Sequence, residues 1–133
     1  MYKQKELKTL LLGASLNPYS YAFMAAKRLY EKGYEFIPMS NKPGTIFGQE
    51  ILDINTKPTL HNIHTIAVYL NPEKQREWYD YLLSIQPQRV IFNPGAENPD
   101  FSQMAKVQGI EVENSCILTL LSIGNYSPSF NVK

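Results

Sequence analysis

The chain has 133 residues, a length typical of one domain, and its 13 Lys and Arg nearly balance its 12 Asp and Glu. A net charge of +1 excludes a general attraction to nucleic acid or to an anionic membrane, so any cationic site has to be local. The single cysteine excludes an intramolecular disulfide, and no apolar run approaches the roughly 20 residues of a membrane-spanning helix. We therefore expect one cytoplasmic domain, residues 1–133, with loosely ordered ends at 1–8 and 127–133.

Strand-like and helical segments alternate along the chain. Strands are expected at 10–12, 35–39, 65–70, 89–92 and 110–113, with one more short strand near 50–52 inside an irregular connection from 41 to 62. Helices are expected at about 20–32, 71–87, 98–109 and 114–124. This order predicts right-handed βαβ units. The predicted fold class is thus α/β, a Rossmann-like open parallel sheet of about five strands with helices on both faces.

The loop after the first predicted strand reads G-A-S-L-N-P, residues 13–18. Gly13 permits a tight turn and a close backbone approach, and Ala14 and Ser15 are small enough to leave room for a ligand. The helix that begins near Ser20 points its unpaired amides and partial positive charge toward this loop, which is typical of phosphate sites. A one-glycine turn is about as often a packing feature, so the loop alone does not decide the matter.

The dipeptide Asn-Pro occurs four times, and helix capping is its ordinary explanation. Asn71 and Asn98 open predicted helices, so we interpret both as N-caps. Asn17-Pro18 and Asn93-Pro94 instead follow predicted strands, at the sheet edge where open α/β folds bind ligands. We therefore predict that these two pairs belong to a binding site.

The end of the second predicted strand carries Ser40, Asn41 and Lys42, with no acidic residue before Glu50. Folds that bind NAD usually have Asp or Glu at this position to bind the ribose hydroxyls. A cation with two neutral polar groups instead favours a phosphorylated ribose. NAD is therefore disfavoured, and NADP and coenzyme A both stay open.

Three motifs carry a resemblance to a known family: G-A-S-x-N-P at 13–18, G-Y-E-x-I-P at 33–38 and N-P-G-x-x-N at 93–98. They resemble the small single-domain CoA-binding proteins, which are similar to the N-terminal CoA-binding domain of the succinyl-CoA synthetase alpha subunit. The resemblance covers roughly residues 9–126 and implies a Rossmann-like domain that binds coenzyme A or an acyl-CoA.

The resemblance also implies a role for each loop. The amides of Gly13, Ala14 and Ser15 would hold the phosphates of CoA. The loop of Ser40, Asn41 and Lys42 would lie against the adenosine and its 3′-phosphate. Asn93, Pro94 and Gly95 would border the path of the pantetheine arm.

One position departs from the pattern of that family. Its members commonly have an arginine two residues after the first Asn-Pro, where this chain has Ser20, and the usual Ser-Tyr that follows is replaced by Ala22-Phe23. The departure implies a weaker or altered grip on phosphate.

No set of residues typical of catalysis or of a metal site is present in the sequence. His61 and His64, the only histidines, precede the third predicted strand and so lie far from the carboxyl edge. A cysteine at the start of a predicted helix, such as Cys116, is more often a small packed residue than a reactive thiol. We therefore predict non-catalytic binding of CoA or an acyl-CoA. The alternatives are an NADP-dependent oxidoreductase and an interaction protein with a vestigial nucleotide pocket. The sequence leaves open whether a protein partner or a homo-oligomer is involved.

Overall fold

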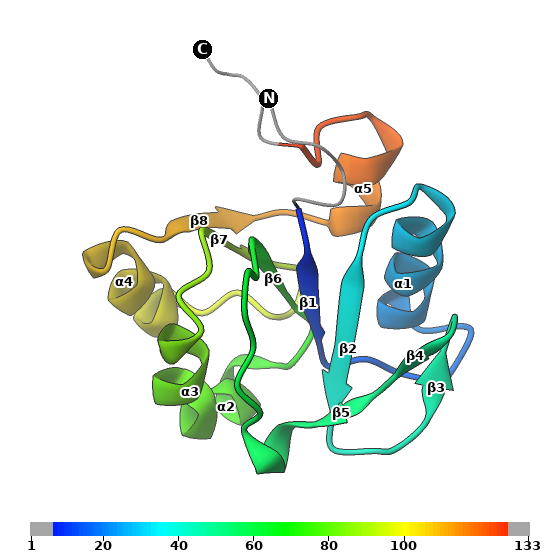
Figure 1. Cartoon of the computed structure of the whole chain (residues 1–133). Helices are drawn as coiled ribbons and strands as arrows, with labels where there is room; N and C mark the ends of the chain where they lie inside the picture. Colours follow the sequence, from blue (N-terminus) through cyan, green and yellow to red (C-terminus); the bar gives the residue numbers. More distant parts are fainter. Residues whose placement is uncertain (1–6, 128–133) are drawn as a thin grey trace.

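The computed structural model describes residues 7–127 and contains one six-stranded sheet in the order β5-β2-β1-β6-β7-β8 (Figure 1). Each neighbouring pair in this sheet is parallel. The strands are β1 (Thr9–Leu12), β2 (Phe36–Ser40), β5 (Leu52–Asp53), β6 (Thr65–Val68), β7 (Arg89–Phe92) and β8 (Glu111–Asn114). The prediction of a Rossmann-like parallel sheet is therefore confirmed. The sixth strand is the two-residue β5, which the sequence indicated only as a short run near 50–52.

The central strands are apolar because both of their faces are covered. Leu10, Leu11 and Leu12 of β1 are completely buried. Successive side chains of a strand point to opposite faces, so Leu10 and Leu12 enter one core while Leu11 enters the other. A continuous apolar run is what a parallel strand buried on both sides requires.

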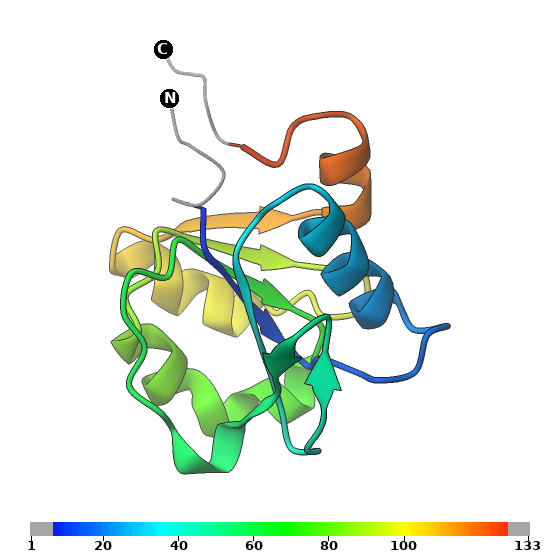
Figure 2. The same cartoon turned by 45° about the vertical axis from the view of Figure 1, so that its right-hand side comes forward.

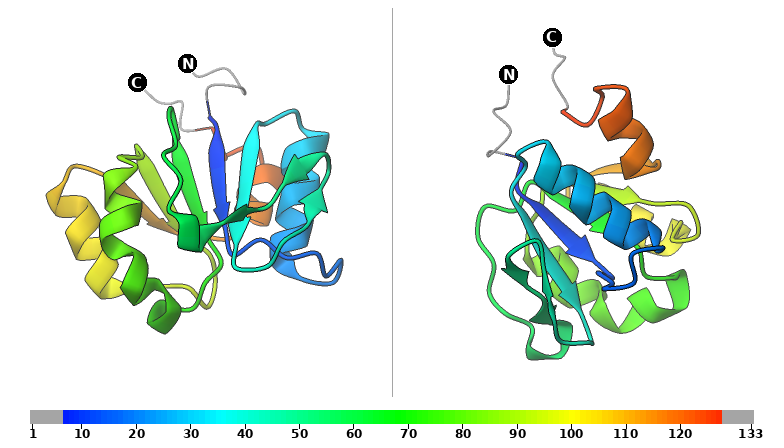
Figure 3. Two further views of the ribbon diagram at one scale, coloured as in Figure 1. Left: turned by 60° about the horizontal axis from the view of Figure 1, so that its bottom comes forward. Right: turned by 90° about the vertical axis from the view of Figure 1, so that its right-hand side faces the viewer.

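Helices pack on both faces of the sheet, which gives the expected three layers (Figure 3, left). One face is covered by α1 (Tyr21–Glu31) and α5 (Ile117–Ser122), the other by α2 (Pro72–Gln75), the 3₁₀ turn η3 (Arg76–Trp78), α3 (Tyr79–Ser84) and α4 (Pro99–Val107). The stretch predicted as one helix over 71–87 is thus divided into three short helical segments. Trp78 and Leu82 nevertheless enter the core of their face as their spacing indicates.

The irregular connection between β2 and β6 holds a small antiparallel hairpin, β3 (Thr45–Ile46) and β4 (Gln49–Glu50), followed by β5 and the 3₁₀ turn η2 (Ile54–Thr56). Its tip residue Phe47 adopts a positive φ of 47°. The Phe47 ring lies 5.3 Å from the ring of Phe23 and stacks on that of Tyr30, also at 5.3 Å. These ring contacts attach the hairpin to α1, and Figure 2 shows the hairpin beside that helix.

The terminal segments predicted to be loosely ordered, 1–8 and 127–133, lie mostly outside the described residues. Leu7, which is described, is completely buried. In the part of the chain that the structure describes, no helix has the length and apolar character needed to cross a membrane.

Candidate functional site

The parallel register brings the predicted loops to one edge of the sheet. Leu12, the last residue of β1, pairs with Met39 of β2 and with Val68 of β6, and Val68 pairs with Phe92, the last residue of β7. The chain therefore leaves the sheet at Gly13, at Asn41 and at Asn93 on the same carboxyl edge. Only β6 stands between β1 and β7.

Gly13 has a backbone conformation that only glycine adopts without strain, with φ at +95°. A Cβ at this position would lie 3.2 Å from the carbonyl carbon of Tyr69 and from the backbone nitrogen of Leu70. The loop therefore turns directly against the segment that follows β6. The tight turn expected at Gly13 is present, and a close approach of its backbone to a ligand stays a prediction.

The amides of this first loop are used differently from the expectation. Those of Gly13 and Ala14 both donate to the carbonyl of Met39, at 2.9 and 3.1 Å, because the loop extends the pairing of β1 with β2. These two hydrogen bonds hold the loop to the sheet, so both amides already have an acceptor within the protein. Within residues 7–127 the amides of Ser15 and Leu16 donate to no protein acceptor. The amides that the first loop can offer to an anion therefore lie one to two residues further along the chain.

Asn17, Pro18 and Ser20 build the entry to α1. The side-chain oxygen of Asn17 accepts from the amide of Tyr19 at 3.0 Å, and the Ser15 hydroxyl accepts from the amide of Asn17 at 3.1 Å. Ser20 is the N-cap of α1, since its hydroxyl accepts from the amide of Phe23 at 3.1 Å and donates to the carbonyl of Asn17 at 2.8 Å. Ser20 is thus used to start the helix.

The second loop folds back on itself and contacts the first. The hydroxyl of Ser40 donates to the Lys42 carbonyl at 3.1 Å and accepts from the Lys42 amide at 3.2 Å. Asn41 and Lys42 are exposed, and in the described ranges Lys42 forms no ion pair. A Cβ on Gly44 would lie 2.5 Å from Cδ1 of Leu16, so the two loops touch at this point. The structure therefore brings the first and second predicted loops together.

Asn93 of the third loop faces the fold. Its side chain is 1% exposed, donates to the carbonyl of Val68 at 3.1 Å and accepts from the amide of Ile117 at 2.9 Å. Both ends of its amide group therefore hold β6 and α5 in place, and its position beside a ligand stays a prediction. Pro94 and Gly95 are exposed at the edge, and Gly95 has a φ of +94° with open space where a Cβ would be.

One residue near this edge, Asp53, was missed at the level of sequence, whereas Cys116 was expected there as a packed residue. Asp53 stands in register beside Ser40, which places an acid next to the second loop. Its carboxylate accepts from the backbone amide of Asn55 at 2.9 Å and caps the turn η2. Cys116 is half-buried at the start of α5, and its side chain makes no capping hydrogen bond. The D-I-N-T sequence after Ile51-Leu52 is a capping signal that could have identified Asp53.

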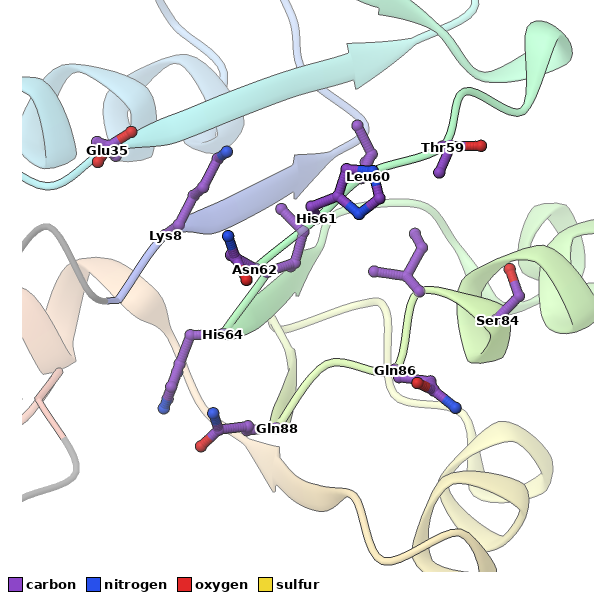
Figure 4. A pocket seen from close by; sticks show the side chains of 12 residues that line it. Lys8, Glu35, Thr59, Leu60, His61, Asn62, His64, Ser84, Gln86 and Gln88 are labelled. Carbon is purple, nitrogen blue, oxygen red and sulfur yellow. The ribbon is translucent and has the colours of Figure 1, made fainter.

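An open hollow of about 1000 Å³ lies at the opposite, amino edge of the sheet (Figure 4). Lys8 and Glu35 stand at the starts of β1 and β2, and His61, Asn62 and Gln86 line the hollow with them. None of the predicted ligand residues contributes to it. In the described part of the chain no group of three or more His, Cys, Asp and Glu residues could hold a metal ion.

His64 belongs to a buried polar network beside that hollow. It is 4% exposed, and its Nδ1 lies 2.8 Å from the hydroxyl of Thr65, to which Nε of Arg89 donates at 3.0 Å. Arg89 also donates to the carbonyl of Tyr126 at 2.8 Å and lies over its ring. Burial, and then the charge of Arg89, lower the pKa of His64 from 6.5 to about 4. His64 is therefore neutral at physiological pH.

This pKa predicts a loss of stability in mild acid. Between pH 6.5 and pH 4 the unfolded chain binds a proton at His64 that the folded chain does not bind, so the free energy of unfolding falls as the pH falls. We expect this group to remove about 2 kcal/mol between pH 7.5 and pH 5, as measured by urea unfolding at both values. His64→Asn should remove that part of the pH dependence, and the exposed-site control His61→Asn should retain it. An equal pH dependence in wild type and His64→Asn would contradict the assignment.

Comparison with known proteins identifies a family for this chain. A family described as "CoA binding domain" matches residues 8–122 of this chain, and a search of curated proteins found no match. A crystal structure titled as that of an uncharacterized protein is 41% identical, with a TM-score of 0.88, and the match covers 94% of this chain and 100% of that one.

Two more distant structures share the fold. A Thermus thermophilus protein, cell-free ID.343, is 22% identical with a TM-score of 0.76, and the match covers 90% of each chain. A hypothetical protein from Pyrococcus horikoshii OT3 is 21% identical with a TM-score of 0.73, covering 87% of this chain and 81% of that one. Since the family match spans most of the sequence, including all three loops of the carboxyl edge, the chain belongs to the CoA binding domain family.

Proposed function

We propose that this chain binds coenzyme A or an acyl-CoA at the carboxyl edge of its sheet and performs no chemistry on it. The observation that supports this most is the family match over residues 8–122, because it includes the loops that follow β1, β2 and β7. The contact between Leu16 and Gly44 supports it further, since one ligand can then reach the first and second loops together. A small molecule of the CoA type is accordingly the proposed partner.

Each loop has a separate part in this proposal. The amides of Ser15 and Leu16, with the N-terminal end of α1 behind them, receive the diphosphate, because the amides of Gly13 and Ala14 are occupied by Met39. Asn41 and Lys42 receive the adenosine and its 3′-phosphate. Pro94 and Gly95 border the pantetheine arm, and Asn93 holds them in place from the interior.

Lys42 is the residue whose contribution can be isolated. It is exposed and its ammonium group is available to a phosphate, so the expected gain is that of a solvent-exposed charge pair, about 1 kcal/mol. We expect Lys42→Ala to weaken CoA about three- to tenfold and dephospho-CoA less than twofold. Lys106→Ala, on the exposed end of α4, is the matched control and should change neither affinity. Isothermal titration of both ligands measures these affinities.

A thermal-shift series with CoA, dephospho-CoA, NADP and NAD tests the proposal itself. A ligand present at 100 times its dissociation constant stabilises a protein by about 2.7 kcal/mol, which raises the melting temperature measurably. The proposed function predicts the largest shift with CoA. A shift with NADP alone would favour an oxidoreductase, and no shift with any of the four would favour an interaction protein with a vestigial pocket.

A further inference from the structure

Gln75 is a fully buried polar residue at the end of the short helix α2, and it joins two loops of the carboxyl edge. Its side-chain nitrogen donates to the carbonyl of Leu70 and to the carbonyl of Ala96, each at 2.8 Å. Its side-chain oxygen accepts from the side-chain amide of Asn98 at 2.9 Å. Both N–H groups and the oxygen are therefore used, and their partners belong to the loops after β6 and β7.

Asn98 connects Gln75 to the helices α3 and α4. Its side-chain nitrogen also donates to the hydroxyl of Tyr79 at 2.9 Å, and its oxygen caps α4 by accepting from the amide of Phe101 at 3.0 Å. The rings of Tyr79 and Phe101 stack with centroids 5.0 Å apart. The exposed Pro94-Gly95 segment is thus held between the inward-facing Asn93 and a fixed segment at Ala96–Asn98.

The same network reaches the first loop through Leu70. The carbonyl of Leu70 accepts from Gln75, while its backbone nitrogen lies 3.2 Å from the position that a Cβ on Gly13 would take. Hydrogen bonds therefore join Ala96 to Gln75 and Gln75 to Leu70, and the backbone of Leu70 lies close to the turn at Gly13. Gln75 is the central member of this chain of contacts.

We infer that Gln75 is a positioning residue that sets the spacing between the first loop and the Pro94-Gly95 segment, so that the site favours ligands long enough to contact both. The inference rests on the proposed binding of coenzyme A, whose adenosine half and pantetheine arm would lie on the two sides of this spacing. A ligand that occupies only the adenosine half does not depend on the spacing. The binding free energy of CoA should therefore depend on Gln75, and that of 3′,5′-ADP should not.

The test compares CoA with 3′,5′-ADP by isothermal titration on the full chain. Gln75→Met keeps the length of the side chain and removes its hydrogen bonds, so we expect CoA binding to weaken at least tenfold and 3′,5′-ADP binding to change less than twofold. Gln103→Met, the same substitution at an exposed position of α4, is the control and should change neither. Tyr79→Phe removes only one partner of Asn98 and should weaken CoA two- to threefold, again without affecting 3′,5′-ADP.

The ratio of the affinity for CoA to that for 3′,5′-ADP distinguishes a positioning role of Gln75 from a general loss of folded protein. Circular dichroism establishes that each variant is folded, and if Gln75→Met is not, the ratio measured for Tyr79→Phe decides. Equal weakening of both ligands, or an unchanged affinity for CoA, would overturn the role of Gln75 while leaving the proposed function in place. A wild-type chain that binds no CoA would overturn the proposed function and this inference together.

Discussion

Replacing Gly13 with alanine is expected to lower the free energy of unfolding by about 3 kcal/mol. Two costs add at this position. The backbone has a φ of +95°, which an L-residue adopts only with strain, and the new Cβ would lie 3.2 Å from backbone atoms of Tyr69 and Leu70. Those atoms follow directly after β6 and cannot move away without disturbing the sheet. Urea unfolding monitored by circular dichroism measures the difference.

Gly109→Ala is the matched control for the backbone term. Gly109 has a φ of +80°, but no atom lies within 4 Å of where its Cβ would be. We expect this substitution to lower the free energy of unfolding by about 1 kcal/mol. The difference between the losses in Gly13→Ala and Gly109→Ala then measures the cost of the contact with residues 69–70. Equal losses at the two positions would show that this contact is relaxed at no cost. Because the first loop also shifts in Gly13→Ala, CoA binding should weaken there and stay unchanged in Gly109→Ala.

The fold was predictable because apolar strands and amphipathic helices alternate along the chain. The apolar runs at 10–12, 66–68 and 90–92 belong to strands buried on both faces, and such runs between helical segments are typical of a parallel sheet covered by helices. A short strand was expected near 50–52, but the pairing of β5 with Met39 and Ser40 was not predictable, since it depends on where the hairpin at 45–50 directs the chain. That hairpin is fixed by the packing of Phe47 on α1, a contact with no local signal.

The site was predictable as a set of loops and less so as a set of side chains. The end of a strand tells which edge a loop occupies, and the loops after β1, β2 and β7 do meet at one edge. Whether a side chain there faces outward is decided by partners far away in the sequence. Asn93 turns inward to the amide of Ile117, which is 24 residues away. Gln75 lies in the polar sequence P-E-K-Q, typical of a solvated helix, and yet it is completely buried.

Replacing Asn93 with alanine is expected to lower the free energy of unfolding by about 3 kcal/mol. The change removes the side chain that accepts from the amide of Ile117, whose own side chain is completely buried, and it removes a donor to the carbonyl of Val68. A buried amide without an acceptor costs about 1–3 kcal/mol, and the lost packing adds to this. Chemical unfolding of the two proteins at pH 7.5 measures the loss.

Asn71→Ala is the matched control, since both asparagines precede a proline and both accept from a backbone amide. Asn71 is exposed and caps α2 through the amide of Lys74 at 3.0 Å, so its loss should cost about 1 kcal/mol, the value usual for an N-cap. The threefold difference between two identical dipeptides would then come from the burial of Asn93 and from its second hydrogen bond, to the carbonyl of Val68. If Asn93→Ala instead weakened CoA binding at unchanged stability, Asn93 would contact the ligand directly. In that case its hydrogen bonds to Val68 and Ile117 would contribute little to the stability of the fold.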